Sequence, residues 1–134
     1  MTQIYKASCL CGAVNLTVEG FSAQAAHCHC NMCRKFHGAA FGTLVAVTGT
    51  KWLTGLDSLQ EFTAKNGTIR SFCNVCGSSI AFRSKGMPFT DAELAISLFD
   101  EDIPVEIDAH IYTNSKANWC VLNDGLICFS EGRI

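Results

Sequence analysis

The sequence predicts one domain built mainly from β-strands, and three observations support this fold class. Short runs that are apolar, or that alternate between apolar and polar residues, recur along the chain between glycine-containing turns. The 134 residues are 49% hydrophobic, which is enough for a single core, and this length suits one domain. Only one short stretch of the first half favours a helix. We therefore expect a single domain over residues 1–134, a sandwich- or barrel-like β fold with little helix.

The first half of the chain predicts two strands with a helix between them. Ala13–Val18 alternates in part between apolar and polar residues, as a half-buried strand does. Ala39–Val47 is a short apolar run with β-branched residues, which is typical of a buried strand. Asn31–His37 is the stretch that suggests a helix, of about two turns.

The second half predicts a hairpin followed by three strands. The hairpin joins Leu59–Thr63 to Thr68–Phe72 through Asn66-Gly67, a dipeptide typical of hairpin turns. The later runs are short and separated by turn residues, which favours further strands. These are Ser79–Arg83, Leu94–Phe99 and Val105–Tyr112.

Composition and charge argue against several classes of partner. The longest apolar run, Ala39–Val47, is far shorter than the roughly 20 residues of a membrane-spanning helix. Met1–Lys6 lacks the basic start and apolar stretch of a secretory signal, so we expect a cytoplasmic protein without a membrane partner. The formal net charge is −2 with no basic block, which argues against a nucleic-acid partner.

Nine cysteines are the unusual feature of the composition. Their number is odd, no secretory signal is visible and the chain is long enough for a core of its own, so metal binding is favoured over disulfides. Seven of the nine fall into three groups. The first is Cys9-Leu10-Cys11, the second Cys28-His29-Cys30-Asn31-Met32-Cys33, and the third Cys73-Asn74-Val75-Cys76.

Each spacing brings sulfur atoms together. In an extended segment residues i and i+2 point to the same face, so Cys9 and Cys11 can direct two sulfurs at one point, as can Cys28 and Cys30. A C-x-x-C turn also converges two sulfurs, and Gly77 after it relieves crowding where the backbone turns. Four thiolates close a structural zinc site, whereas three leave a fourth position for water or substrate, as in catalytic zinc sites.

Spacing leaves open which groups share a metal. One partition joins the first and third groups and leaves the three thiols of the second group as an open site. Another joins Cys30 and Cys33 of the second group to the third group, as in a ribbon-like zinc site. A single structural zinc with three spare buried thiols is the remaining interpretation.

The three groups and their neighbours resemble a known family. Ser8–Gly12, His27–Arg34 and Phe72–Gly77 are similar to the cysteine signature of the glutathione-dependent formaldehyde-activating enzyme family, which includes the centromere protein V domain. The resemblance runs from about Ala7 to Phe129. Further matching segments are Leu98-Phe99-Asp100, His110-Ile111-Tyr112, Ser115-Lys116, Trp119 and Asp124-Gly125-Leu126.

This resemblance implies a zinc-containing β-tent of short antiparallel sheets, and it implies the first partition. The structural zinc would be held by Cys9, Cys11, Cys73 and Cys76, and the catalytic zinc by Cys28, Cys30 and Cys33. It also implies a carbon–sulfur lyase that reversibly forms S-(hydroxymethyl)glutathione from formaldehyde and glutathione. The expected partner is thus a small-molecule thiol or its aldehyde adduct, although no glutathione-binding motif is recognisable and no cofactor besides zinc is assigned. The alternative is a non-catalytic, zinc-stabilised β domain that binds a thiol ligand or a protein partner.

Basic residues and histidines near the second group have expected roles. Three thiolates around a divalent zinc leave a net charge of −1, which Arg34 or Lys35 is placed to offset, or either residue could bind an anionic substrate. His27 and His29 would face away from the sulfurs in an extended chain, which favours surface or packing roles. His37 follows the cluster and is favoured as a residue outside the pocket.

The end of the chain has a packing interpretation and a functional one. His110 and Tyr112 alternate and should share one strand face, with Trp119 capping the core. The alternative is a pocket wall in which Lys116 meets a substrate carboxylate. The remaining cysteines have apolar neighbours, so we expect them in the core. They are Cys120 and Cys128.

Overall fold

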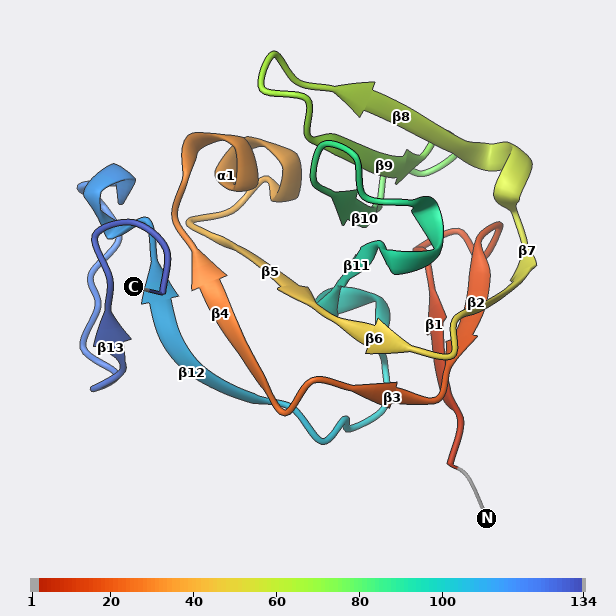
Figure 1. The fold of residues 1–134 in the computed structure, drawn as a ribbon, viewed down its shortest axis with the longest axis horizontal. Coiled ribbons are helices and arrows are strands. Elements are labelled where there is room, and N and C mark those ends of the chain that lie inside the picture. Colours follow the sequence, from red (N-terminus) through yellow and green to blue (C-terminus); the bar gives the residue numbers. More distant parts are fainter. Residues whose placement is uncertain (1–2, 134) are drawn as a thin grey trace.

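Short strands and one α-helix make up residues 3–133, the part of the chain that the structure, a computed structural model, describes (Figure 1). The strands are β1 (Tyr5–Ser8), β2 (Asn15–Val18), β3 (Gly20–Phe21), β4 (Gln24–Cys28), β5 (Gly42–Val45), β6 (Val47–Thr48), β7 (Lys51–Thr54), β8 (Leu59–Thr63), β9 (Ile69–Cys73), β10 (Ser79–Arg83), β11 (Glu93–Ala95), β12 (Glu106–Ile111) and β13 (Ile127–Cys128). The α-helix is α1 (Asn31–His37), and the 3-10 helices are η1 (Leu56–Ser58), η2 (Phe89–Asp91), η3 (Ile96–Leu98) and η4 (Thr113–Ser115).

One large sheet and two small ones organise these strands. The large sheet has eight strands in the order β13-β12-β4-β5-β11-β10-β9-β8. A three-stranded sheet has the order β1-β2-β7, and β3 pairs with β6. The three-stranded sheet and β13 lie at opposite ends of the molecule (Figure 1). The predicted mainly β fold is thus confirmed.

The elements with strong local signals form where the sequence predicts them. The hairpin of β8 and β9 is antiparallel, with Thr63 opposite Ile69, and the Asn66 side chain accepts a hydrogen bond from the backbone N–H of Thr68 in its turn. Helix α1 spans the predicted residues. The Cys30 sulfur caps its first turn, and Gly38 ends it in a left-handed conformation that favours glycine.

Other elements differ from the prediction. The expected strand Ala39–Val47 begins only at Gly42 and breaks between β5 and β6, and Leu94–Phe99 is a strand only in β11 before it turns into η3. Strand β4 was not predicted, because Gln-Ala-Ala-His-Cys carries little apolar alternation. It forms because β5 and β12 hydrogen-bond to either side of it. Most pairs of strands are antiparallel, but β12 pairs in parallel with both β4 and β13.

The core lies between the three-stranded sheet and the large sheet. Leu16 and Val18 of β2 are almost fully buried, as are Val45 of β5 and Leu94 of β11. Val45 and Leu94 are directly opposite each other, so this face of the large sheet packs on the core. The opposite face of β5 and β11 does not pack on this core and borders a cavity. Within residues 3–133 no helix has the length and apolar character needed to cross a membrane.

Gly55 provides a test of the join between β7 and η1. Its φ is +89°, and a Cβ atom there would collide with the backbone carbonyl of Ala13. Gly86 has a similar φ of +84° with open space around it. We expect Gly86→Ala to lower the free energy of unfolding by about 1–2 kcal/mol, the cost of left-handed backbone. Gly55→Ala should cost about 1–3 kcal/mol more because of the overlap. Urea denaturation measures both, and equal losses would contradict this account.

Candidate functional site

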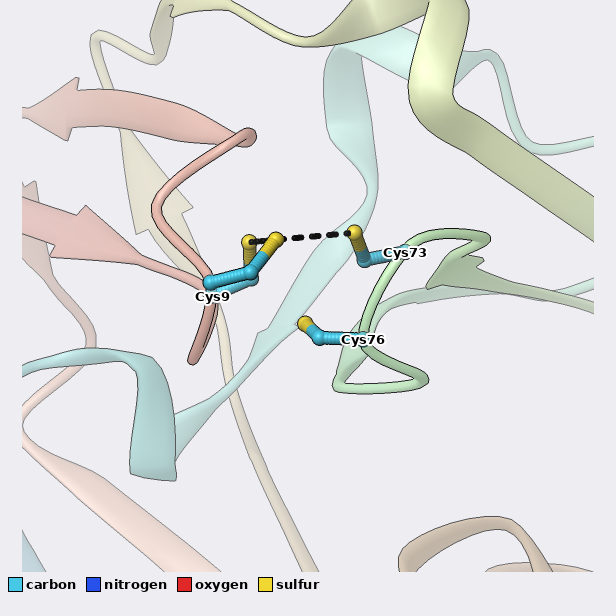
Figure 2. A group of neighbouring side chains, drawn as sticks. Cys9, Cys73 and Cys76 are labelled. Carbon is cyan, nitrogen blue, oxygen red and sulfur yellow. Dashed lines mark hydrogen bonds between the residues drawn. The ribbon is translucent and has the colours of Figure 1, made fainter.

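Four cysteines from two distant turns meet beside the core. Cys9 and Cys11 lie in the turn after β1, whereas Cys73 ends β9 and Cys76 lies in the turn that follows it. All four sulfurs lie within 4.8 Å of one another, with Cys9 and Cys11 3.6 Å apart and Cys11 and Cys73 3.9 Å apart. Figure 2 shows the side chains of Cys9, Cys73 and Cys76 pointing toward a common centre. This cluster, which we call the four-thiol cluster, could hold a metal ion.

The four-thiol cluster fits zinc. A tetrahedron of bonds of about 2.3 Å places sulfurs about 3.8 Å apart, close to the separations seen here. Gly77 closes the second turn by donating its N–H to the Cys73 carbonyl at 2.7 Å, and its φ is +80°. Cys73 is fully buried, so a metal here would be shielded on the side of the core.

Three further cysteines form a separate cluster where β4 enters α1. Cys28 ends β4, Cys30 caps the helix and Cys33 lies in its first turn, and their sulfurs lie within 4.8 Å of one another. The N–H of Cys33 donates to the Cys30 sulfur at 3.3 Å. This three-thiol cluster could also hold a metal ion. The structure therefore groups the cysteines as the family resemblance implies, and among the described residues it does not bring Cys30 and Cys33 together with Cys73 and Cys76.

The thiols of the three-thiol cluster differ in pKa. Hydrogen bonds with Cys28 and then with Cys33 lower the pKa of Cys30, and the positive charge of Arg70 lowers it further. The contact with Cys30, followed by that with Cys33, raises the pKa of Cys28. Cys30 is thus the first of the three to become a thiolate.

A cavity of about 510 Å³ borders the three-thiol cluster, and all three cysteines line it. This volume suits a small-molecule ligand. Its walls are largely apolar, with Leu44, Phe82 and Ile111 among the lining residues, and it also contains the charged side chains Arg70 and Glu93. We call it the thiol pocket. A second hollow, of about 880 Å³, is lined by residues that include Cys9, Cys11 and His37.

The basic residues that line the thiol pocket are Arg70 and Arg133, rather than Arg34 or Lys35. Arg70 is only 6% exposed, and its Nη1 donates to the Thr68 hydroxyl at 3.0 Å. Arg34 instead donates to the backbone carbonyl of Ser115 outside this pocket. The sequence did carry a signal for Arg70, since it is a charged residue within a predicted strand three positions before Cys73.

A buried chain of histidines lies next to the three-thiol cluster. His29 Nε2 is 2.9 Å from His110 Nδ1, and His110 Nε2 is 2.7 Å from a carboxylate oxygen of Asp124. Both histidines are at most 1% exposed, whereas the Asp124 side chain is 46% exposed. His29 belongs to neither thiol cluster, and His27 stacks on Phe41. The pairing of His29 with His110 was not predicted, because 81 residues separate them.

The end of the chain departs from the expected packing. Trp119 does not cap the core: it is 64% exposed, with the Arg34 guanidinium above its ring. Cys128 is exposed and Cys120 is half-buried, so the prediction that both lie in the core is wrong. The reason is that β13 is a two-residue edge strand beside β12, and this segment covers no sheet face.

Tyr112 and Lys116 also take positions other than those expected. Tyr112 has a φ of +56° just after β12, so it does not continue the strand face of His110, and it lines the thiol pocket. Lys116 donates to the carbonyls of Ala117 and Cys120, at 3.1 and 2.6 Å, and does not line that pocket. Its ammonium group thus stabilises a turn.

Comparison with known proteins identifies the family. The family model described as "Glutathione-dependent formaldehyde-activating enzyme" matches residues 4–115. A crystal structure of a Rhodobacter sphaeroides structural-genomics protein is similar in fold, with a TM-score of 0.59 and 18% identity over 92% of this chain and 98% of that one. No match is found among curated proteins. Since the family model covers most of the chain, including all seven clustered cysteines, the protein belongs to the glutathione-dependent formaldehyde-activating enzyme family.

Proposed function

We propose that this protein is a zinc-dependent carbon–sulfur lyase that forms and cleaves hydroxymethyl thiol adducts, such as S-(hydroxymethyl)glutathione. The observation that carries the proposal is the three-thiol cluster in the wall of a small-molecule pocket. Family membership supports glutathione and formaldehyde as the chemistry of the ligands.

We assign one zinc to each cluster. The four-thiol cluster offers a complete tetrahedral set, which is typical of a structural zinc. The three-thiol cluster offers only Cys28, Cys30 and Cys33, a set that leaves room for an exchangeable ligand. Zinc bound there would supply Lewis acidity and keep a substrate thiol deprotonated near neutral pH. Seven thiols that must stay reduced to bind metal favour a reducing compartment such as the cytoplasm.

The chain's own residues prepare the pocket for the reaction. In the forward direction the thiol sulfur adds to the formaldehyde carbon, a C–S bond forms, and the thiol proton ends on the new hydroxyl oxygen. The apolar side chains Leu44, Phe82 and Ile111 limit water around the reacting atoms. The buried guanidinium of Arg70 offsets negative charge on the thiolates and on the adduct oxygen.

The test combines a metal count with a rate. Protein purified with zinc is mixed with glutathione and ¹³C-formaldehyde, and exchange NMR measures how fast free and adduct formaldehyde interconvert. We expect two zinc ions per chain and an exchange rate that rises in proportion to protein concentration. Two zinc ions without acceleration would favour the alternative of a binding domain. One inert zinc would favour a purely structural metal.

A further inference from the structure

Two charged side chains of the thiol pocket form no salt bridge among residues 3–133. Arg70 is nearly buried, and its Nε has no hydrogen-bond partner among the described residues. Glu93 forms no ion pair within residues 3–133, and burial alone raises its pKa. The other basic residue in the lining, Arg133, is already paired with Asp108 at 2.7 Å. Because Arg70 faces the thiols, Glu93 is the side chain that presents an unpaired charge to whatever occupies the pocket.

The strand register places Arg70 and Glu93 on the same face of the large sheet. Phe82 of β10 is directly opposite Arg70 on one side and Glu93 on the other. Residues paired in this way share a face, and two strand spacings separate the outer pair by about 10 Å. The Arg70 guanidinium lies over the Phe82 ring, 5.0 Å from its centre. The two charges are thus held apart by an apolar ring.

The same register relates Glu93 to the three-thiol cluster. Gly42 of β5 pairs with Cys28, and Leu44 pairs with Ala95. Alternate residues of a strand share a face, so Cys28, Leu44 and Glu93 all face the pocket. Glu93 lies about four residues along the strands from the level of Cys28, or roughly 14 Å of strand length, and two strand spacings, or about 10 Å, across the sheet. The carboxylate therefore stands at a distance from the sulfurs. The long side chain of Arg70 instead reaches the three-thiol cluster, where its Nη1 donates to the sulfur of Met32 at 3.7 Å.

We infer that Glu93 is a specificity-determining residue, which binds a cationic group at the far end of an elongated thiol whose sulfur lies at the three-thiol cluster. This inference rests on the proposed function and names its substrate class. A positively charged group of a ligand would stabilise the ionised form of this unpaired, half-buried carboxylate. An ammonium group supplies that charge together with hydrogen-bond donors.

The length of the pocket selects among aminothiols. A ligand that joins the sulfurs to Glu93 must span on the order of 10 Å, once both side chains project toward it. An extended peptide spans about 3.3–3.6 Å per residue. A dipeptide or tripeptide thiol with a free amino group can therefore reach both ends, whereas free cysteine cannot. Glutathione has a free amino group on the residue that precedes its cysteine and so satisfies both conditions.

The test compares glutathione with N-acetylglutathione, which keeps the thiol and both carboxylates but lacks the cation. Calorimetry measures the dissociation constant of each thiol with the zinc-loaded wild-type protein, Glu93→Gln and Glu101→Gln. Glu101 is an exposed glutamate outside the pocket and serves as the matched control. We expect the wild type and Glu101→Gln to prefer glutathione by about tenfold, the effect of one charge-assisted hydrogen bond. Glu93→Gln should lose this preference and bind N-acetylglutathione as the wild type does.

The outcomes separate this inference from the proposed function. If the wild type bound glutathione and N-acetylglutathione equally well, or if Glu93→Gln kept the preference for glutathione, the role of Glu93 would be overturned. The wild-type measurement alone tests the preference even if the variant does not fold. Turnover is measured separately by the formaldehyde exchange rate. A protein that binds glutathione selectively but does not accelerate exchange would overturn the lyase and leave the cation-binding role of Glu93 supported. In an active protein, Glu93→Gln should raise KM for glutathione and leave kcat unchanged.

Discussion

Replacing Cys30 with serine will nearly abolish the formaldehyde exchange activity while the domain remains folded. Cys30 is one of the three thiols of its cluster, so the serine variant would leave the proposed zinc with two cysteine ligands. Loss of a hydrogen-bond partner of a metal ligand already lowers metal affinity or activity about 10–100-fold, so loss of a ligand itself should lower activity more than about 100-fold. The fold should survive because Cys30 is only half-buried and a serine can still cap α1. Exchange NMR and circular dichroism measure the two effects.

Cys128→Ser provides the matched control for this prediction. Cys128 is exposed and belongs to neither thiol cluster. Like Cys30→Ser, its substitution replaces one cysteine sulfur by oxygen. It should retain full activity. If Cys30→Ser turned over as fast as Cys128→Ser, the three-thiol cluster would not be the reactive centre.

Removing the zinc that we assign to the four-thiol cluster is expected to destabilise the protein strongly. This cluster joins the turn after β1 to the turn after β9, two segments that no strand pairing connects. Structural zinc contributes about 10–16 kcal/mol to the folding of small zinc-finger peptides. A domain with its own core depends on zinc less, and we expect a loss of several kcal/mol and a clear fall in Tm.

Thermal unfolding before and after chelation measures this effect, with the zinc content verified at each step. Cys73→Ser isolates the four-thiol cluster, because Cys73 lies outside the thiol pocket. Its Tm should fall in the presence of zinc, whereas that of Cys120→Ser should change little. An unchanged Tm after complete removal of zinc would rule out a structural role for the metal.

Local signals made much of the fold predictable. The hairpin follows from Asn66-Gly67 between two alternating runs, and α1 follows from a stretch that Gly38 ends. The two clusters arise from spacings that converge sulfurs within each segment. The choice between partitions came from family resemblance, because it depends on which turns meet in space, and spacing within a segment does not carry that information.

The long-range features were not predictable from the sequence pattern. Strand β4 is stabilised by neighbours on both sides rather than by its own composition. Arg70 and Glu93 come from strands β9 and β11, and only the register through Phe82 places them on one face. The histidine pair likewise depends on the parallel contact of β12 with β4. Trp119 is exposed although it is apolar, and Cys128 although its neighbours are apolar, because apolar character does not ensure burial in segments at the edge of a sheet.

The last eighteen described residues lie beyond the family match, yet they contribute to the buried histidine chain and to the lining of the thiol pocket. Asp124 is the outer partner of His110, and Arg133 forms part of the lining of the thiol pocket. A deletion after Ser115 would leave the buried His110 without its carboxylate and remove β13 from the sheet. Expression tags should therefore be attached at the other end, because a fusion here would follow closely on Arg133, which lines the thiol pocket.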